Sequence, residues 1–180
     1  MNQFINRMLG AAQLESATYE EVENDDQATP QALGVVVLSS LATGIGAATQ
    51  AGIAIGLIVG TLVALLGWVL WAALTWAIGT KLLPESTTEA DIGQLLRTTG
   101  FAMTPGVLRV LGVIPALGPL IVLAANVWML VAMVIGVRQA LDYSSTWRAV
   151  GVCVIGWVIM VVLQALVFAL FGSSGQPGAG

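Results

Sequence analysis

The longest uncharged stretch of the chain sets the strongest limit on its fold. From Gln31 to Thr80, 50 consecutive residues carry no charge. A helix that crosses a bilayer needs roughly 20 apolar residues, so this stretch is long enough for two crossings joined by a tight hairpin. Two further uncharged stretches follow at 110–137 and 149–180. The pattern predicts an integral membrane protein.

The composition points the same way. Of the 180 residues, 57% are hydrophobic and only 9% are charged, whereas a soluble domain carries about 25% charged residues. A soluble fold of this size could not hide so much apolar surface from water. We therefore predict an all-α, polytopic helix bundle that forms one domain.

We expect five transmembrane helices, at about residues 31–48, 53–78, 101–114, 119–138 and 149–171. The break between the first two lies at 49–52, the most polar point of the long stretch. Arg109 interrupts the third segment, and a two-proline turn at 115–119 follows it. The membrane domain is thus predicted at 30–171, followed by a Gly- and Ser-rich tail at 172–180 that is expected to be disordered.

The basic residues favour five crossings. With five spans, one side of the membrane holds Arg7, Lys81, Arg97, Arg138 and Arg148, and the other side holds none apart from Arg109. If the third segment did not cross, the split would be three to two. Basic residues concentrate in cytoplasmic loops. We therefore expect a multi-pass protein of the inner (cytoplasmic) membrane, with its amino terminus in the cytoplasm and its carboxyl terminus outside.

Residues 1–29 are predicted to form a cytoplasmic amino-terminal segment. Phe4, Ile5, Met8 and Leu9 share one face of a helix within residues 1–14, a short amphipathic pattern suited to the membrane interface. The alternative is a frayed terminus.

The acidic residues cluster just after this helix. Six of the ten acidic side chains lie before position 27. Thr18 and Glu21 make a capping-box pattern, which predicts a short helix from Tyr19. The rest of 15–29 is predicted to be a solvated acidic linker, and the alternative is a surface that binds a partner.

Several classes of function are excluded by what the chain lacks. It has no histidine and one cysteine, Cys153, so neither a histidine-based catalytic site nor a metal site is expected. No Asp or Glu lies in any predicted span, which argues against an intramembrane enzyme and against an ion-coupled carrier. No basic patch is present to bind nucleic acid. We expect no cofactor and no enzymatic activity.

Small residues recur every four positions along the long uncharged stretch. Gly44, Gly52, Gly56 and Gly60, with Ala48 and Ala64 in the same register, place small side chains on one helix face, as in a glycine zipper. Such a face lets another backbone approach closely. It predicts an interface between protomers or with a partner, or alternatively packing within the bundle or the lining of a pore.

Arg109 is the one charge inside a predicted span. It lies five residues before Ile114 and Pro115, so its long side chain could snorkel to the outer interface. The alternatives are a buried ion pair or carbonyl contact, and a contact with a substrate. Of the tryptophans, Trp76 and Trp147 are predicted at the membrane interface. Trp68, Trp71, Trp128 and Trp157 are predicted to be packing residues.

Several motifs in order resemble those of a known family. Gly100, Phe101 and Pro105 form a Gly-aromatic-x-x-x-Pro element, and Pro115 with Gly118 forms an Ile-Pro-x-x-Gly turn. A segment from Trp128 through Gly136 and Arg138 to Ala140, and then Ser144 to Ala149, complete the series.

In these motifs residues 30–171 resemble the bacterial branch of the Yip-one family, membrane proteins named for their interaction with Ypt/Rab GTPases. The resemblance implies five spans and a cytoplasmic amino terminus. Eukaryotic members act in vesicle traffic and carry an Asp-Leu-Tyr-Gly-Pro element before the first span, which is not found at 15–30 of this chain.

We therefore expect a non-enzymatic membrane protein that acts by protein or lipid interaction, as a scaffold or accessory subunit in membrane organisation or trafficking-like processes. The expected partners are membrane lipids and further copies of the chain or other membrane proteins. The alternative is a small-molecule or lipid transporter or a channel component. Its polar lining would be drawn from Arg109, Asn126, Gln164 and Thr61.

Overall fold

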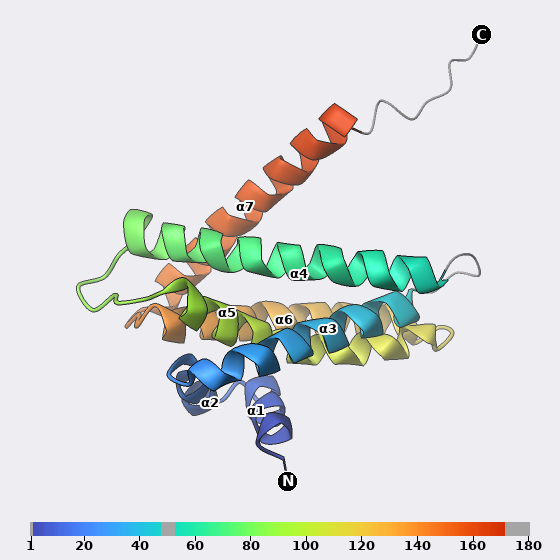
Figure 1. Cartoon of the computed structure of the whole chain (residues 1–180), viewed down its shortest axis with the longest axis horizontal. Coiled ribbons are helices and arrows are strands. Elements are labelled where there is room, and N and C mark those ends of the chain that lie inside the picture. The colour runs from blue at the N-terminus through green and yellow to red at the C-terminus, as the bar shows by residue number, and fades with distance from the viewer. Residues whose placement is uncertain (1, 48–52, 172–180) are drawn as a thin grey trace.

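The computed structural model describes residues 2–47 and 53–171, and all regular structure in these two stretches is helical (Figure 1). The break predicted at 49–52 and the tail predicted at 172–180 lie outside the described residues. In chain order the elements are α1 Gln3–Ala12, α2 Ser16–Glu23, the 3-10 turn η1 Asp26–Ala28, α3 Thr29–Gly46, α4 Ile53–Ala77, the π-helical turn η2 Ile78–Leu82, α5 Ile92–Phe101, the 3-10 segment η3 Thr104–Val113, α6 Gly118–Ala140 and α7 Thr146–Phe171.

Within the described residues, four helices are long and apolar enough to cross a bilayer. They cover Asp26–Gly46, Ile55–Leu82, Gly118–Ala140 and Thr146–Leu170. These correspond to the first, second, fourth and fifth predicted spans. Proline opens both α3 and α6, at Pro30 and Pro119, because a first-turn proline has no N–H to leave unpaired.

The third predicted span has a composite form instead of one long helix. α5 ends at Phe101, and after a short turn the chain continues as the 3-10 segment η3. Pro105 stands at the start of η3; proline lacks the N–H that an α-helix would need there and crowds the preceding turn. The structure thus has four long apolar helices rather than the five that the sequence predicts.

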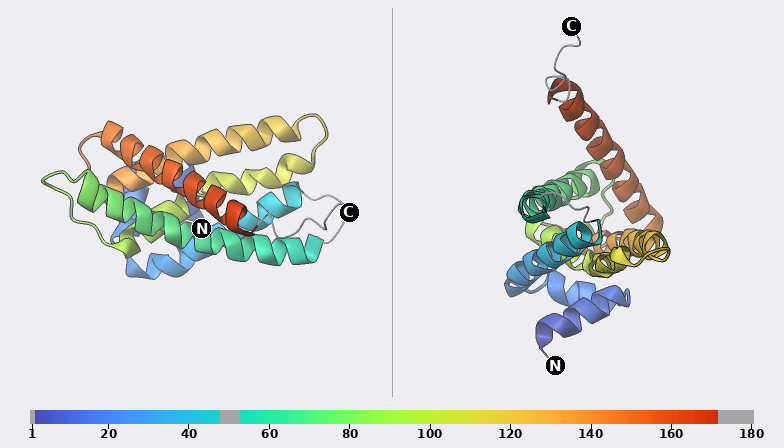
Figure 2. Two further views of the ribbon diagram at one scale, coloured as in Figure 1. Left: turned by 90° about the horizontal axis from the view of Figure 1, so that it is seen from above. Right: turned by 90° about the vertical axis from the view of Figure 1, so that its right-hand side faces the viewer.

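The composite segment nevertheless runs along the whole of α3, in the same direction. Gly100 lies against Ala32, Gly106 against Ser39 and Gly112 against Gly46. In Figure 2 the segment leads from α5 to the turn before α6 at the other end of the bundle.

The amino-terminal segment is folded against this bundle. Tyr19 and Val22 of α2 are fully buried in one core with Val35, Val36 and Phe101. Tyr19 donates a hydrogen bond to the carbonyl of Ala11 at 3.0 Å, which holds α1 to α2. Thus the prediction of a solvated linker over 15–29 is wrong, and α2 begins at Ser16, three residues before the predicted start.

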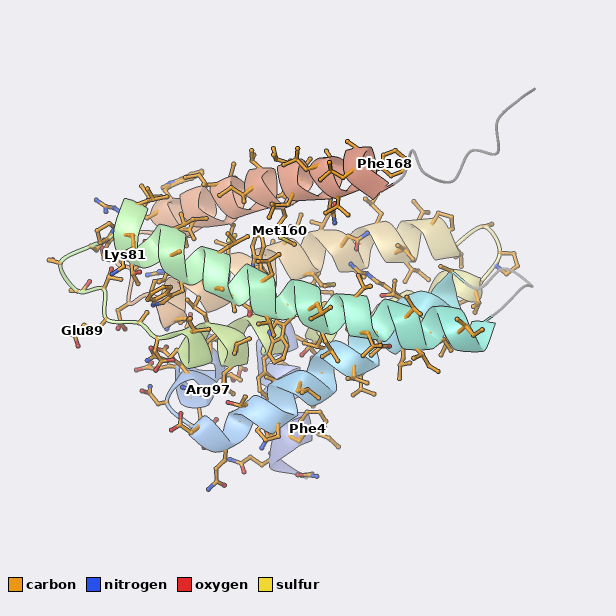
Figure 3. The ribbon with its side chains drawn as sticks, turned by 45° about the horizontal axis from the view of Figure 1, so that its top comes forward. Phe4, Lys81, Glu89, Arg97, Met160 and Phe168 are labelled. Atoms are coloured by element: carbon orange, nitrogen blue, oxygen red, sulfur yellow. The ribbon has the colours of Figure 1, made fainter. Side chains whose placement is uncertain are left out.

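The two loops at the same end of the bundle are also joined. Tyr143 donates hydrogen bonds to the carbonyls of Gly79 at 3.0 Å and Leu83 at 2.6 Å. Glu85 accepts from the Ser144 hydroxyl at 2.7 Å and pairs with Arg148 at 3.2 Å. Figure 3 shows Lys81 and Glu89 at this end, far from Phe168. We call it the charged end, defined by residues 2–28, 79–98 and 138–148.

The opposite half of the bundle is loosely covered. Every residue from 161 to 170 of α7 is exposed, and α7 diverges from the other helices towards its carboxyl end (Figure 1). Exposed apolar side chains also follow α4, including Ile55, Ile58 and Leu62. An apolar surface of this kind is suited to hydrocarbon rather than water.

Candidate functional site

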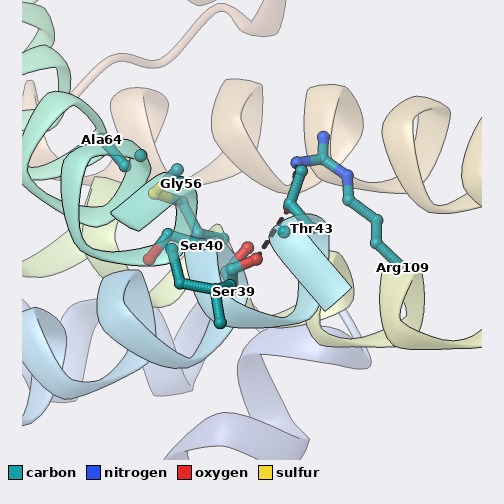
Figure 4. A pocket seen from close by; sticks show the side chains of 10 residues that line it. Ser39, Ser40, Thr43, Gly56, Ala64 and Arg109 are labelled. Atoms are coloured by element: carbon teal, nitrogen blue, oxygen red, sulfur yellow. Dashed lines mark hydrogen bonds between the residues drawn. The ribbon is translucent and has the colours of Figure 1, made fainter. Parts of the chain in front are cut away.

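Arg109 points into the bundle from η3. Its Nη1 donates a hydrogen bond to Thr43 Oγ1 of α3 at 3.2 Å (Figure 4). Its Nη2 donates to Asn126 Oδ1 of α6. Its Nε is buried and has no hydrogen-bond partner within residues 2–47 and 53–171. The side chain therefore does not snorkel towards the interface, as one interpretation of the sequence expected. It joins three elements through neutral polar groups.

No carboxylate lies near Arg109 to balance its charge. All ten acidic side chains of the chain belong to residues 15–26, 85–91 and 142, which form or adjoin the charged end. Asn126 and Arg138 are separated by 12 residues of α6, or roughly 18 Å along a helix. The guanidinium thus holds an unpaired positive charge in the other half of the bundle.

A cavity of about 230 Å³ opens beside Arg109. Most of its surface is apolar, and we call it the polar cavity only because hydroxyl side chains and Arg109 are among its lining residues. Ser39, Ser40 and Thr43 of α3 line one wall, and Gly56 and Gly60 of α4 line another (Figure 4). Ser40 donates a hydrogen bond to Thr61 Oγ1 at 3.1 Å, which ties α3 to α4. Thr61, predicted as part of a polar lining, contacts Ser40 but does not itself line the cavity.

A second cavity, of about 470 Å³, begins at Arg109 and Asn126 on the other side. The rest of its wall is apolar and comes from α4, α6 and α7, with Trp68, Trp71, Met129, Met133, Trp157 and Met160 among its lining residues. A third cavity of about 400 Å³ shares Trp71, Leu130, Met133 and Trp157 with it and extends towards Val150 and Cys153. We call the second and third cavities together the apolar groove.

The sequence interpretation missed this groove. It took Trp157 for a packing residue, yet 61% of this side chain is exposed. The methionines at 129 and 133, four residues apart on one face of α6, were a signal that could have found it, since methionine is common at adaptable binding surfaces. Gln164, predicted with Arg109 as a polar lining, is exposed on α7 and lines neither cavity next to Arg109.

The glycines of the predicted glycine zipper differ in whether another part of the chain packs against them. A Cβ on Gly44 would meet the end of the Leu57 side chain of α4, so Gly44 packs against α4 within the chain. For Gly56 and Gly60, no described atom lies within 4 Å of the position a Cβ would take. Gly52 lies outside the described residues. The open part of the face is therefore Gly56 and Gly60, both exposed on α4.

The motif residues that carried the family resemblance hold the structure together. A Cβ on Gly100 would lie 2.7 Å from the Ala32 side chain, and Phe101 is fully buried. Pro105 is buried at the start of η3. Pro115 lies in the turn before α6, where the N–H of Gly118 donates to the carbonyl of Ile114 at 2.8 Å.

The charged end pairs its buried arginines with carboxylates. Arg7, of which 3% is exposed, pairs with Asp25 at 2.6 Å and Glu21 at 2.9 Å. Arg97 pairs with Asp26 at 2.9 Å and donates two hydrogen bonds to the carbonyl of Glu23. The acidic run is therefore engaged within the chain, an outcome that neither sequence interpretation included.

One carboxyl group at the charged end, that of Glu23, has a pKa well above the ordinary value of a glutamate. Burial raises the pKa of Glu23 to about 7, and the nearby Asp142 and Glu20 add to the effect. Gln94 Nε2 donates to Glu23 Oε1 at 3.1 Å. By contrast, the hydrogen bond from Arg7 lowers the pKa of Asp25, and hydrogen bonds from Ser144 lower that of Glu85.

Comparison with known proteins identifies the fold family. No curated protein and no solved structure shows significant similarity to the chain. The sequence profile described as the Yip1 domain, however, matches residues 16–167. The match covers the folded acidic segment, all four long apolar helices except the last residues of α7, and the composite segment. The chain is therefore a multi-pass membrane protein that belongs to the Yip1 domain family.

Proposed function

We propose that the chain crosses the bilayer five times, with α5 and η3 together forming the third crossing. Ten α-helical residues extend about 15 Å and ten 3-10 residues about 20 Å, which together match a hydrocarbon core of about 30 Å. The parallel course of this segment along α3 supports the proposal. The charged end then lies in the cytoplasm by the positive-inside rule, and the carboxyl terminus lies outside.

The proposed location is the inner membrane of a bacterium. The absence of an Asp-Leu-Tyr-Gly-Pro element at 15–30 and the resemblance to the bacterial branch support this assignment. Exposed lipid-facing surface on α4 and α7 supports a multi-pass position in the bilayer.

Within the membrane, the chain acts without catalysis, as a scaffold or accessory subunit that associates through helix contacts. The observation that carries this function is the open glycine face: Gly56 and Gly60 are exposed on α4 and are not covered by the described part of the chain. In a bilayer, close approach of backbones at small residues drives helix association. The partner we assign to this face is a second copy of the chain.

The test is the oligomeric state in lipid nanodiscs, measured by native mass spectrometry or stepwise photobleaching. Gly56→Leu and Gly60→Leu should weaken self-association by about tenfold or more, equivalent to about 1.4 kcal/mol. Gly34→Leu, the same change on α3 where only Phe4 lies within 4 Å of the Cβ position, serves as the control. A wild-type chain that is monomeric and retains no partner would contradict the proposal.

The alternative function is transport of a small molecule or lipid. The polar cavity beside Arg109 favours it, because a hydrophilic substrate needs polar groups inside the membrane. A flux assay in liposomes decides between the two functions. Transport by the wild-type chain that is lost in Arg109→Ala and kept in Arg138→Gln, which changes an arginine at the charged end, would establish the alternative and displace the scaffold.

A further inference from the structure

The positive charge of Arg109 requires a partner that residues 2–47 and 53–171 do not supply. A buried or half-buried charge is costly unless a counter-charge or several hydrogen bonds compensate it. Thr43 and Asn126 accept two of the guanidinium hydrogen bonds, but both are neutral, and the buried Nε–H remains unpaired within the described structure. The remaining N–H donors and the net charge both suit an oxyanion, because guanidinium binds phosphate and carboxylate through several parallel hydrogen bonds.

The polar cavity provides room for such an oxyanion. Its volume of about 230 Å³ is several times the roughly 30 Å³ that one water molecule takes in the liquid. The hydroxyl-bearing Ser39, Ser40 and Thr43 line it together with Arg109. The hydroxyls of Ser40 and Thr43 already donate to the carbonyls of Val37 and Ser39, each at 2.8 Å, so the main donor that this cavity offers to a phosphate is the guanidinium itself.

The apolar groove begins at the same guanidinium and leads away from it. Arg109 and Asn126 line its polar beginning, and Trp68, Met133 and Trp157 line the wall farther along. On α6 the lining residues proceed from Asn126 to Met129, Met133 and Val134, that is, towards the charged end. The groove thus runs from Arg109 through the middle of the bundle towards the charged end, where Val150 lines it two residues after Arg148.

This order of groups matches one class of molecule. In the proposed topology Arg109 lies in the outer half of the bilayer. A lipid of the outer leaflet has its headgroup at the outer surface, and its acyl chains extend from there towards the bilayer centre. A phosphate near Arg109 and an acyl chain along the apolar groove would follow that direction. A soluble anion would use the charge but would leave the groove empty.

We propose that Arg109 and the apolar groove form a binding site for a phospholipid with an anionic headgroup. The headgroup phosphate binds the guanidinium at the polar cavity, and one acyl chain lies between α4, α6 and α7. The site rests on the proposed five-crossing topology for its depth in the outer leaflet. Gly56 and Gly60 also line the polar cavity, but lipid binding does not require self-association.

The test uses two lipids that differ only in their headgroup, dioleoyl phosphatidylglycerol and dioleoyl phosphatidylcholine. The protein is purified in a mild detergent and incubated with an equimolar mixture, and the retained lipids are counted by native mass spectrometry. The wild-type chain should retain phosphatidylglycerol about tenfold better than phosphatidylcholine. Arg109→Gln should bring the two lipids close to parity, and Arg109→Lys should keep part of the preference.

A second variant tests the groove without removing the charge. Leu130 lines both parts of the groove and is 64% exposed, so Leu130→Trp can fill the groove without disturbing the core. It should lower retention of both lipids about tenfold. Arg138→Gln, which removes an arginine at the charged end, is the control and should keep the wild-type preference.

Three results would overturn the proposal. They are equal retention of both lipids by the wild-type chain, an unchanged preference in Arg109→Gln, and full retention in Leu130→Trp. Displacement of phosphatidylglycerol by millimolar inorganic phosphate alone would also overturn it, because the site would then be one for a soluble anion. If Arg109→Gln fails to fold, Arg109→Lys and Leu130→Trp still decide. A failed lipid test with intact self-association would leave the scaffold proposal in place.

Discussion

Arg7 and Arg109 are both arginines inside the folded part of the chain, but they lie in regions with opposite chemistry. At the charged end, Arg7 is almost fully buried and meets two carboxylates, at 2.6 and 2.9 Å. In the other half, Arg109 meets a hydroxyl and an amide and has one buried donor without a partner in the described residues. The first arginine is satisfied by the chain itself, and the second is left with a charge that an outside group can use.

The two regions also differ in how tightly their side chains are packed, and the charged end is the better packed of the two. The buried aromatic and aliphatic side chains gather at or near the charged end, around Tyr19, Phe101 and Leu141. The half that holds Arg109 has the two cavities that this arginine lines, the open glycines and the exposed end of α7. The comparison indicates that the charged end holds the bundle together, while the other half offers surface to lipids and partners.

The largest expected effect concerns the core at the charged end. Phe101→Ala should lower the free energy of unfolding by about 3 kcal/mol, because truncation of a fully buried phenylalanine leaves a cavity. Phe168→Ala, at a side chain 77% exposed on α7, should change it by less than about 0.5 kcal/mol. Equilibrium unfolding in mild detergent measures both, and equal losses would refute the division into a packed and an open region.

The two arginines should respond differently to removal of their charge. Arg7→Met leaves Glu21 and Asp25 without their partner and should cost about 2 kcal/mol of unfolding free energy. In detergent without anionic lipid, Arg109→Met should be neutral or stabilising, because it removes a charge that no carboxylate of the chain balances. The same unfolding measurement applies. A larger loss for Arg109→Met than for Arg7→Met would contradict the comparison.

The glycines of the two regions should also differ. Gly100→Ala should destabilise the fold by about 1–2 kcal/mol, since its Cβ would lie 2.7 Å from the Ala32 side chain. Gly56→Ala should leave the monomer unchanged or slightly more stable, because its Cβ meets no described atom and alanine favours the helix. Thermal unfolding of the monomeric fraction compares the two. Similar destabilisation by both changes would show that α4 is covered at Gly56.

The smallest effect is a pH dependence at the charged end. The pKa of Glu23 is raised to about 7 in the folded chain from an ordinary value of about 4.3, so the folded state binds more protons between these values. Stability from this group is therefore complete below about pH 4 and decreases as the pH rises towards 7, by a change on the order of 1 kcal/mol. Glu23→Gln should remove this slope in unfolding measured from pH 4.5 to 7.5. A slope that persists in Glu23→Gln belongs to another group.

The membrane spans could be predicted because uncharged length alone determines which segments suit a bilayer. The positions of α3, α4, α6 and α7 follow from the charges and prolines that bound them. The fold of 15–29 could not be predicted, because its partners are distant in sequence: Arg7 precedes Asp25 by 18 residues, and Arg97 follows Glu23 by 74. The local sequence pattern shows a cluster of acidic residues, but it does not show which arginines these residues pair with in the fold.

The site was only partly accessible to sequence reasoning. Arg109 could be identified from the sequence as an intramembrane charge. The direction in which its side chain points depends on the 3-10 form of η3, and the α-helical periodicity used to interpret the sequence does not predict a 3-10 segment. Gly56 and Gly60 could be recognised from their spacing, and Gly44 could not be separated from them without the contact to Leu57. The apolar groove depends on how α7 packs on α4 and α6. This packing could not be predicted from the sequence of any one of these helices.

The central claim is that the composite segment crosses the membrane, since it places Arg109 and its groove in the outer half and the charged end in the cytoplasm. Single cysteines at positions 26, 116 and 144, in a Cys153→Ser background, can be labelled in intact cells with a membrane-impermeant maleimide. Five crossings predict that position 116, in the turn between η3 and α6, is labelled from outside, and that positions 26 and 144 are protected until the membrane is opened. Labelling of position 144 from outside with protection of position 116 would show four crossings and contradict the account.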